Sequence, residues 1–221
     1  MKTTLAAATA VELVKAGNAT IAIDLDVEHQ SLSLWAQDRA VQHPDREQIS
    51  VQAAASADVA LRIANAAIGA QVAIIDCPSR ASEATIAIAA AADLVVMPIV
   101  PGRKDVLLTA VTLGTILNAG VKPERLALVL TRMLTEPEVR DHKEWLGSFV
   151  YRGDTLKLMV LDTPVLEKPV YRNAVSRGLA ITEVAPVSLR KSARATIDEL
   201  IGAAMASLDE QTEPTKEGVR V

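Results

Sequence analysis

The chain has 221 residues, of which half are apolar and only 2% are aromatic, and its formal net charge is −4. This length suits one α/β domain with a sizeable core, and the charge excludes binding to polyanions through the chain as a whole. A single cysteine, Cys77, excludes an intrachain disulfide, and no apolar run reaches the roughly 18 residues of a membrane span. We therefore expect a cytoplasmic protein in which any contact with nucleic acid uses a local basic patch.

Short apolar runs alternate with longer helical stretches, and glycines or capping side chains mark most boundaries. Gly17, Gly69 and Gly120 each follow a helical stretch, while Ser56 and Ser188 can cap the helices that begin there. In chain order, the predicted elements are helix 4–16, strand 19–24, edge strand 49–52, helix 56–68, strand 71–76, helix 82–91, strand 94–99, helix 104–119, strand 126–130, a helix with Pro137 in its first turn, strand 158–161 and helix 188–208.

This alternation predicts an α/β fold with a mostly parallel sheet covered by helices on both faces, in a single domain over residues 1–208. Residues 209–221 are polar, and we expect them to form a frayed tail. In parallel sheets of this kind the ligand lies at the carboxyl ends of the strands. The polar residues just after each apolar run are therefore the candidates for function.

Charged and hydroxyl side chains follow three of the predicted strands at the point where each strand ends. They are Asp24 with Asp26, Asp76, and Thr131 with Arg132. Lys2, Thr3 and Thr4 open the first helix, where a lysine offers charge to phosphates, a threonine hydroxyl binds Mg²⁺, and the helix amino end favours an anion. Each feature alone is more often a cap or a solvated carboxylate. Their order along the chain favours a nucleotide site.

These motifs resemble those of the ParA/MinD-type ATPases, the P-loop family with a deviant Walker A motif. Residues 2–26 resemble the Walker A lysine, its helix and the strand that ends in D-x-D, and residues 74–105 resemble the Walker B and switch II region. LVLTRM at 128–133 and KPVYRNAVSRG at 168–178 resemble two further segments of the family. The resemblance extends to about Leu208, is nearest to the plasmid-partition branch, and implies a P-loop NTPase sheet with ATP and Mg²⁺ as ligands.

The resemblance also implies a role for each matching residue. Lys2 would bind phosphate, and Asp26 would activate the attacking water. Thr3, which is followed by Thr4, would bind Mg²⁺ directly, and Asp76 would bind it through a water. Thr131 and Arg132 would lie near the adenine. Hydrolysis in this fold consists of positioning and charge neutralisation, so these few groups would suffice.

The sequence departs from the family at its start, because Met1 stands where the last glycine of K-G-G-x-G-K-T-T should be. The glycine loop and the first strand, which is central in the family's sheet, are absent from the printed sequence. We expect an opened core and poor ATP binding, with hydrolysis only where the loop is restored. The sequence leaves open whether the cause is a misplaced start codon.

Three functions compete. The first is a partition ATPase that forms a homodimer around ATP, binds double-stranded DNA nonspecifically, associates with the nucleoid, and segregates plasmid or chromosomal DNA with a ParB-like adaptor. The second is a binding module of the same fold without nucleotide chemistry. The third is a related enzyme that positions a protein cargo. A membrane role is disfavoured because residues 210–221 lack the apolar spacing of an amphipathic helix.

The candidate DNA-binding residues are Arg190, Lys191 and Arg194, at the start of the last predicted helix, where cations oppose the helix dipole. The equally weighted alternative is a solvated face in which Arg194 pairs with Asp198, one turn on. Arg172 and Arg177 are weaker candidates. The three histidines, His29, His43 and His142, have no ligand spacing, and we expect them on the surface.

Overall fold

The computed structural model describes residues 1–67, 69–79 and 82–212. The predicted helix end at Ile68, Arg80 and Ala81 of the switch-like segment, and the tail beyond residue 212 lie outside the described residues.

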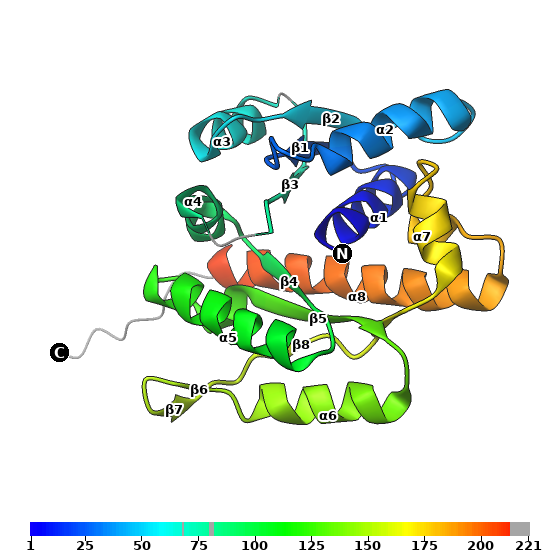
Figure 1. Ribbon diagram of the computed structural model, residues 1–221. Helices are drawn as coiled ribbons and strands as arrows, with labels where there is room; N and C mark the ends of the chain where they lie inside the picture. The colour runs from blue at the N-terminus through cyan, green and yellow to red at the C-terminus, as the bar shows by residue number, and fades with distance from the viewer. Residues whose placement is uncertain (68, 80–81, 213–221) are drawn as a thin grey trace.

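Eight α-helices and nine strands make up the described chain (Figure 1). The helices are α1 (Lys2–Lys15), α2 (Ser31–Gln42), α3 (Ala57–Ala66), α4 (Glu83–Ala91), α5 (Arg103–Asn118), α6 (Glu136–Gly147), α7 (Pro169–Val175) and α8 (Val187–Thr212), with 3-10 turns η1 (Pro123–Arg125) and η2 (Ile181–Glu183). The strands are β1 (Thr20–Asp24), β2 (Ser50–Ala53), β3 (Val72–Asp76), β4 (Val95–Ile99), β5 (Leu126–Met133), β6 (Val150–Tyr151), β7 (Asp154–Thr155), β8 (Met159–Val160) and β9 (Val165–Leu166).

The strands form two parallel sheets, in the orders β2-β1-β3 and β4-β5-β8, with β9 also pairing with β5. Only the β6–β7 hairpin is antiparallel among the described strand pairs. The α/β class and the parallel pairing are confirmed. The expectation that all the main strands share one hydrogen-bonded sheet is wrong, because in the described residues β3 and β4 are each paired on one side only.

The one-sided pairing of β3 and β4 changes their burial. Both are apolar runs, yet Ala73 is exposed and Ile74 and Val96 are only half-buried. Seven of the eight residues from Leu126 to Met133 in β5 are by contrast buried, because β5 has partners on both sides. Unpaired inner strands expose N–H and C=O groups that a parallel neighbour would normally satisfy.

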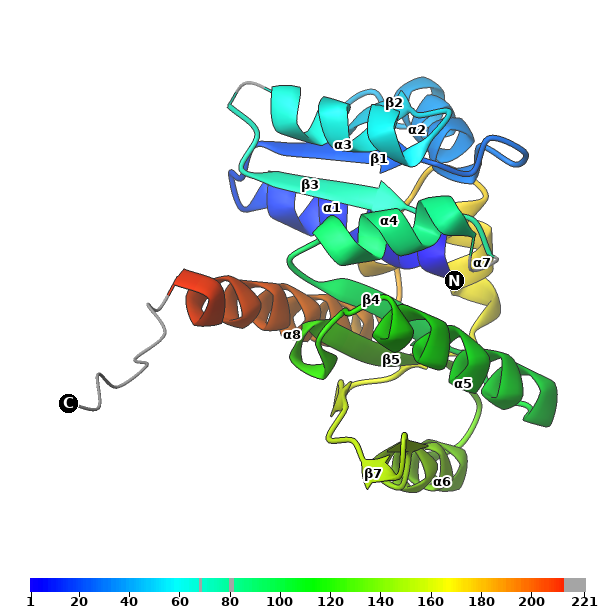
Figure 2. The same ribbon diagram turned by 90° about the vertical axis from the view of Figure 1, so that its left-hand side faces the viewer.

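Helices cover both faces of the two sheets. Helices α1, α2 and α8 lie on one side, and α3, α4 and α5 on the other (Figures 1 and 2). One core cluster contains α1 residues together with Ala22 of β1 and Ala127 and Val129 of β5. The alanine-rich face of α1 therefore packs against both sheets and joins them through apolar contact rather than through a strand ladder.

Local signals place most helix boundaries correctly. The side chains of Ser56, Ser82 and Thr135 accept hydrogen bonds from the first turns of α3, α4 and α6, and Gly17 adopts φ +86° after α1. The prediction that Ser188 caps the last helix is wrong, because α8 already includes Val187. The helix also continues through residues 209–212, which were expected to lie in the frayed tail.

The segment at 168–178 forms α7 and the turn after it, which anchors this helix to α2 and α8. Tyr171 Oη donates to the Leu189 carbonyl oxygen across 2.7 Å. Gly178 has φ +74°, and a Cβ atom on it would lie 2.3 Å from the backbone nitrogen of Arg39. The hydrogen bond of Tyr171 therefore holds α7 against α8. Gly178 allows the turn after α7 to approach the backbone of Arg39, because only a residue without a side chain fits there.

Candidate nucleotide site

The amino end of α1 meets the carboxyl end of β3. Thr3 Oγ1 donates a hydrogen bond to Asp76 Oδ2 across 2.6 Å, although the residues are 73 positions apart in sequence. Asp76 is buried, with 4% of its surface exposed, and Thr3 and Lys2 are half-buried. A threonine hydroxyl and a carboxylate at this spacing fit the hard oxygen ligands that Mg²⁺ prefers. The predicted metal pair, Thr3 and Asp76, is thus brought together, with Thr4 next in the first turn of α1.

Acidic and basic groups shift one another's pKa values where α1 begins and β3 ends. Burial raises the pKa of Asp76 to about 6, with a further rise from nearby Asp24 and opposing effects of Thr3 and Lys2. Burial and the positive charges of Lys2 and Arg132 lower the pKa of the Met1 amino group. Lys2 therefore lies near the buried carboxylate of Asp76, and Arg132 lies near the Met1 amino group, so cations surround this point as a polyphosphate–metal site requires.

The D-x-D motif divides into one structural and one accessible carboxylate. Asp24 is buried, and its Oδ2 accepts hydrogen bonds from the backbone N–H and the hydroxyl of Ser33, both 2.9 Å, in the first turn of α2. Asp24 lies opposite Asp76 in the β1–β3 register, so Asp26 and Asp76 lie on the same edge, as predicted. Asp24 anchors α2, and Asp26 is the carboxylate left for chemistry.

Thr131 and Arg132, at the end of β5, face different surroundings. Thr131 is fully buried, and its hydroxyl donates to the Ile99 carbonyl oxygen at 3.1 Å, so this side chain fastens β5 to β4. Arg132 has φ +60°, and its side chain lies 3.1 Å from a carboxylate oxygen of Glu167. Of the two residues expected near an adenine, Arg132 alone has a side chain at the surface of this edge.

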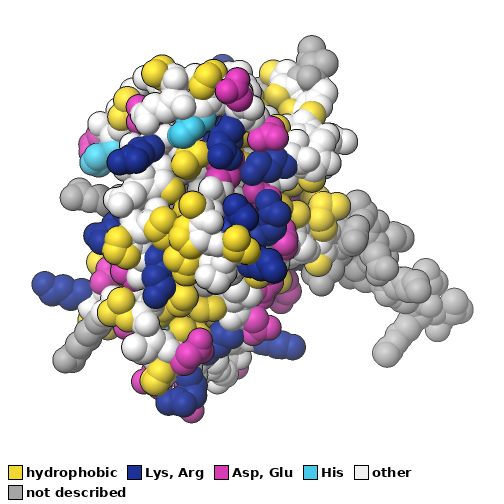
Figure 3. Space-filling view, turned by 90° about the vertical axis from the view of Figure 1, so that its right-hand side faces the viewer, with side chains coloured by type: hydrophobic (Ala, Val, Ile, Leu, Met, Phe, Trp, Pro, Cys, Tyr) yellow, Lys and Arg dark blue, Asp and Glu magenta, His cyan; other side chains and the backbone are white. Residues whose placement is uncertain are grey.

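A basic face is formed by residues of α7, the turn after it and the amino end of α8, on the side of the molecule that Figure 3 shows. Arg172, one of these residues, lies 3.5 Å from Glu167, the carboxylate that also contacts Arg132. Arg172, Arg177 and Lys191 are exposed there, and Arg190 is half-buried. Arg194 does not form the ion pair with Asp198 that the sequence suggested. Its guanidinium instead lies 3.0 Å from the carboxylate of Glu12 on α1, so Arg194 already has a carboxylate partner within the fold.

The histidines are not all free surface residues. His142 Nδ1 lies 2.8 Å from the Glu138 carbonyl oxygen, and His43 Nε2 lies 3.0 Å from the Arg177 carbonyl oxygen. His29 contacts the carboxylate of Asp26. Sequence reasoning missed this last contact because it considered histidine only as a metal ligand, whereas a three-residue separation within a turn also allows a hydrogen bond.

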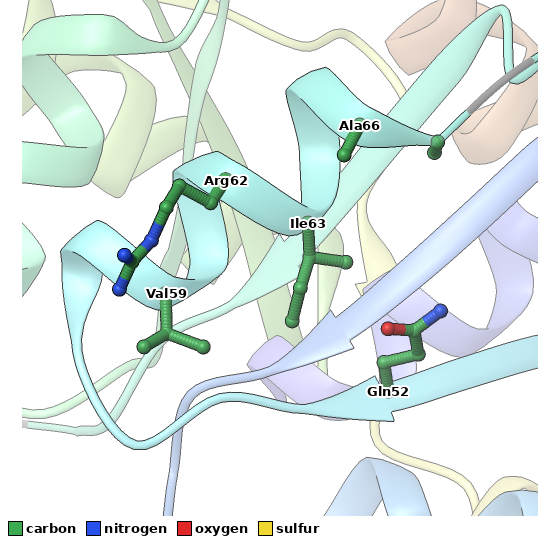
Figure 4. A pocket seen from close by; sticks show the side chains of 6 residues that line it. Gln52, Val59, Arg62, Ile63 and Ala66 are labelled. Carbon is green, nitrogen blue, oxygen red and sulfur yellow. The ribbon is translucent and has the colours of Figure 1, made fainter.

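A shallow pocket of about 360 Å³ lies between β2 and α3, apart from the residues just described (Figure 4). Val59, Ile63, Ala66 and Ala67 line it together with Gln52 and Arg62. Its lining contains no carboxylate and no predicted site residue. In the described part of the chain, no helix is long and apolar enough to cross a membrane.

Comparison with known proteins gives the class of the fold. No protein-family model matches the sequence, and no curated protein matches it. Three similar solved structures are MinD in a MinC:MinD complex from Aquifex aeolicus (15% identity, TM-score 0.68, 90% of each chain), MinD with Mg-ADP from Pyrococcus horikoshii OT3 (16%, 0.66, 93% of each chain) and apo McdA from Cyanthece (16%, 0.64, 90% of this chain and 94% of that one). This chain has the fold of the ParA/MinD type of P-loop ATPase.

Asp76→Asn should stabilise the fold at neutral pH. The folded-state pKa of Asp76, about 6, lies above its ordinary value of 3.8, so ionisation of the buried carboxyl destabilises the fold. The protein is therefore most stable, with respect to this group, below pH 4, and it loses that stability as the pH rises through 6. Asparagine removes that cost, which is about 2–3 kcal/mol at pH 7.5. Urea unfolding at pH 4 and pH 7.5 measures it, with the exposed Asp45→Asn as the control. An unchanged pH dependence would contradict the assigned burial cost.

Proposed function

We propose that this protein is a ParA-like partition ATPase that binds Mg-ATP at the amino end of α1. The observation that carries the proposal is the 2.6 Å contact between Thr3 and Asp76, next to Lys2 at the start of the same helix. A hydroxyl, a buried carboxylate and an ammonium group at one helix amino end match the demands of a magnesium–phosphate complex. One of the similar MinD structures contains Mg-ADP.

Each group has a distinct role in the proposed reaction. Lys2 neutralises the β- and γ-phosphates of ATP, and Thr3 and Asp76 would hold Mg²⁺. Asp26 accepts the proton of the attacking water, and Arg132 lies near the adenine. When bound, Mg²⁺ supplies charge neutralisation for the transferred phosphoryl group. The protein's own residues orient the phosphate chain and the water.

The partners follow from the same proposal. ATP is sandwiched in a homodimer, the dimer binds double-stranded DNA nonspecifically, and a ParB-like adaptor triggers hydrolysis, so that the cytoplasmic protein moves DNA over the nucleoid. Support for DNA binding comes from the basic face, where Arg172, Arg177 and Lys191 are exposed and Arg190 is half-buried. The two helices of this face contact each other through Tyr171 on α7 and Leu189 on α8. Arg194 contributes less to DNA binding, because Glu12 already neutralises its charge.

The test of ATP hydrolysis uses a loop-extended form, which is this chain with a five-residue apolar strand and a glycine-rich turn added ahead of Met1. This form should hydrolyse Mg-ATP slowly and faster with DNA and adaptor. Asp26→Ala should lower kcat at least about 100-fold while ATP affinity stays unchanged, because Asp26 acts on water and not on the nucleotide. The exposed Asp58→Ala serves as the control. Normal turnover by Asp26→Ala would exclude Asp26 as the proton acceptor.

The DNA proposal predicts a change in salt dependence. Replacing Arg190 and Lys191 together by glutamate should weaken binding to any duplex sequence and lower the slope of log affinity against log salt by about two. Arg62→Glu, an exposed cation on α3, is the matched control and should change neither quantity. Fluorescence anisotropy with a random duplex at several salt concentrations provides the measurement. Equal slopes for the double variant and the control would remove this face from the proposal.

A second candidate is a binding module of the same fold that lacks nucleotide chemistry. Its supporting observation is the one-sided pairing of β3 and β4, so that among the described residues no strand pairing joins the two sheets beside the proposed site. The third candidate, an ATPase that positions a protein cargo, shares the nucleotide site and differs in the cargo. Mg-ATP titration separates the second from the other two, and DNA anisotropy separates the first from the third.

A further inference from the structure

Asp26 and His29 are joined by two contacts that end on the same oxygen atom. The backbone N–H of His29 donates to Asp26 Oδ1 across 3.2 Å, and the ring Nδ1 lies 3.1 Å from that oxygen. Because an ionised carboxylate only accepts hydrogen bonds, Nδ1 must carry a proton in this contact. Neither contact engages Oδ2, so the two oxygens of Asp26 have different surroundings.

The turn that carries both residues is fastened at each end. The Gln30 N–H donates to the Asp26 carbonyl oxygen at 2.7 Å, and the Asp26 N–H donates to Asp24 Oδ1 at 3.1 Å. Asp24 in turn holds Ser33 in the first turn of α2. The backbone of Asp26 therefore lies on a frame built from β1 and α2, and its Oδ1 is held by the backbone N–H and the ring of His29.

The exposures of the two side chains fit this arrangement. The side chain of Asp26 is 17% exposed, and that of His29 is 66% exposed. Burial pushes the pKa of Asp26 upward, but the hydrogen bonds from the His29 ring and backbone outweigh it and leave the pKa below its usual value. His29 thus stabilises the ionised form of Asp26, which is the form in which a carboxylate can accept a proton from water.

We propose that His29 is the positioning residue for Asp26, holding Oδ1 so that Oδ2 faces the attacking water. The proposal rests on the ATP hydrolysis proposed above. In that step the water oxygen bonds to the γ-phosphorus while the bond from this phosphorus to the β–γ bridging oxygen breaks. The proton from water passes to Asp26 Oδ2 and from there to the γ-phosphate that has taken up the water oxygen. The products are ADP, which leaves with the bridging oxygen, and inorganic phosphate.

The first test measures the contact in the protein as it is, without nucleotide. Carbon-detected NMR follows the titration of the Asp26 carboxyl, which is assigned by its disappearance in Asp26→Asn. His29→Ala should raise the titration midpoint by about half a pH unit or more, since the ring donor is lost. His29→Asn, whose amide nitrogen takes the place of Nδ1, should restore most of the difference.

The second test separates positioning from general stabilisation of the turn. In the loop-extended form, His29→Ala should lower kcat about tenfold with KM unchanged, and His29→Asn should recover it. His142→Ala on α6 is the control histidine and should leave kcat unchanged. An Asp26 midpoint that does not move in His29→Ala, or an unchanged kcat, overturns the proposal. Failure of the loop-extended form to bind Mg-ATP would overturn the proposed function separately, and the NMR titration would still decide whether His29 holds Asp26.

Discussion

Glu183→Gln should destabilise the protein by about 3–5 kcal/mol, because it leaves a buried arginine without its counter-ion. Glu183 Oε2 lies 2.7 Å from Arg39 Nη1, and Oε1 lies 3.0 Å from Arg39 Nη2. The Arg39 side chain is fully buried and the Glu183 side chain is 1% exposed. Lys15 and Arg46 also approach Oε1, at 3.2 and 3.1 Å, so one carboxylate neutralises cations from α1, α2 and the loop after α2. Removing its charge leaves three cations close together.

The pH dependence gives this prediction a second readout. Burial opposes ionisation of Glu183, but hydrogen bonds from Arg39 and the Ala180 N–H prevail and lower its pKa to about 2, from an ordinary 4.5. The stability that this carboxylate contributes is therefore present above pH 4.5 and is lost as pH falls toward 2. In urea unfolding experiments, Glu183→Gln should therefore reduce the fall in unfolding free energy between pH 4.5 and pH 2.

The control for Glu183 is a carboxylate in an exposed ion pair. Asp162 lies 2.9 Å from Lys143 Nζ, and its side chain is 92% exposed. Asp162→Asn should change the free energy of unfolding by no more than about 0.5–1 kcal/mol. An equal loss of unfolding free energy in the two variants would show that burial of the Arg39–Glu183 pair does not increase its contribution to stability.

The positions of the site residues could be predicted well from the sequence, because strand ends determine them. Apolar runs ending at Asp24 and Asp76 predict two parallel strands, and the structure places these residues opposite each other in register. The Thr3–Asp76 contact follows from the helix that begins at the same edge. Periodicity and order along the chain therefore suffice wherever a parallel sheet fixes which strand ends meet.

Contacts between distant polar residues could not be predicted in this way. Arg39 and Glu183 are 144 positions apart, and no periodic pattern marks either one as buried. Helix α2 was also not predicted, because Ser31–Gln42 mixes polar and apolar residues and its first turn is held by Asp24 rather than by an adjacent cap. The sequence analysis did expect an opened core, and in the described residues β3 and β4 are each paired on one side only. It did not predict that the remaining strands form two separate sheets, since apolar composition predicts a strand but not its neighbours.

The loop-extended form should bind Mg-ATP about a thousandfold more tightly than the chain that begins at Met1. At the amino end of α1, the first backbone N–H groups of the helix and Lys2 can donate to a phosphate. A glycine-rich turn adds converging backbone N–H groups, each a charge-assisted hydrogen bond of about 1.5–3 kcal/mol. Two or three such bonds, less the entropy of ordering the turn, amount to roughly 4 kcal/mol, which is a thousandfold in affinity. Calorimetric titration of both forms with Mg-ATP measures the ratio.

The same comparison tests whether the added strand occupies the space between β3 and β4. These strands are unpaired on the sides that face each other across α1 and α4 (Figure 2), and the amino end of α1 lies at the carboxyl end of β3. A parallel strand that leads into α1 would satisfy both edges, so hydrogen exchange should slow at Ile74 and Val96 in the loop-extended form. A control extension with serine and glycine in place of the apolar strand should leave exchange fast at both positions. If the chain that begins at Met1 binds Mg-ATP as tightly as the loop-extended form, the glycine turn is dispensable, and Lys2, Thr3 and Asp76 form a sufficient nucleotide site on their own.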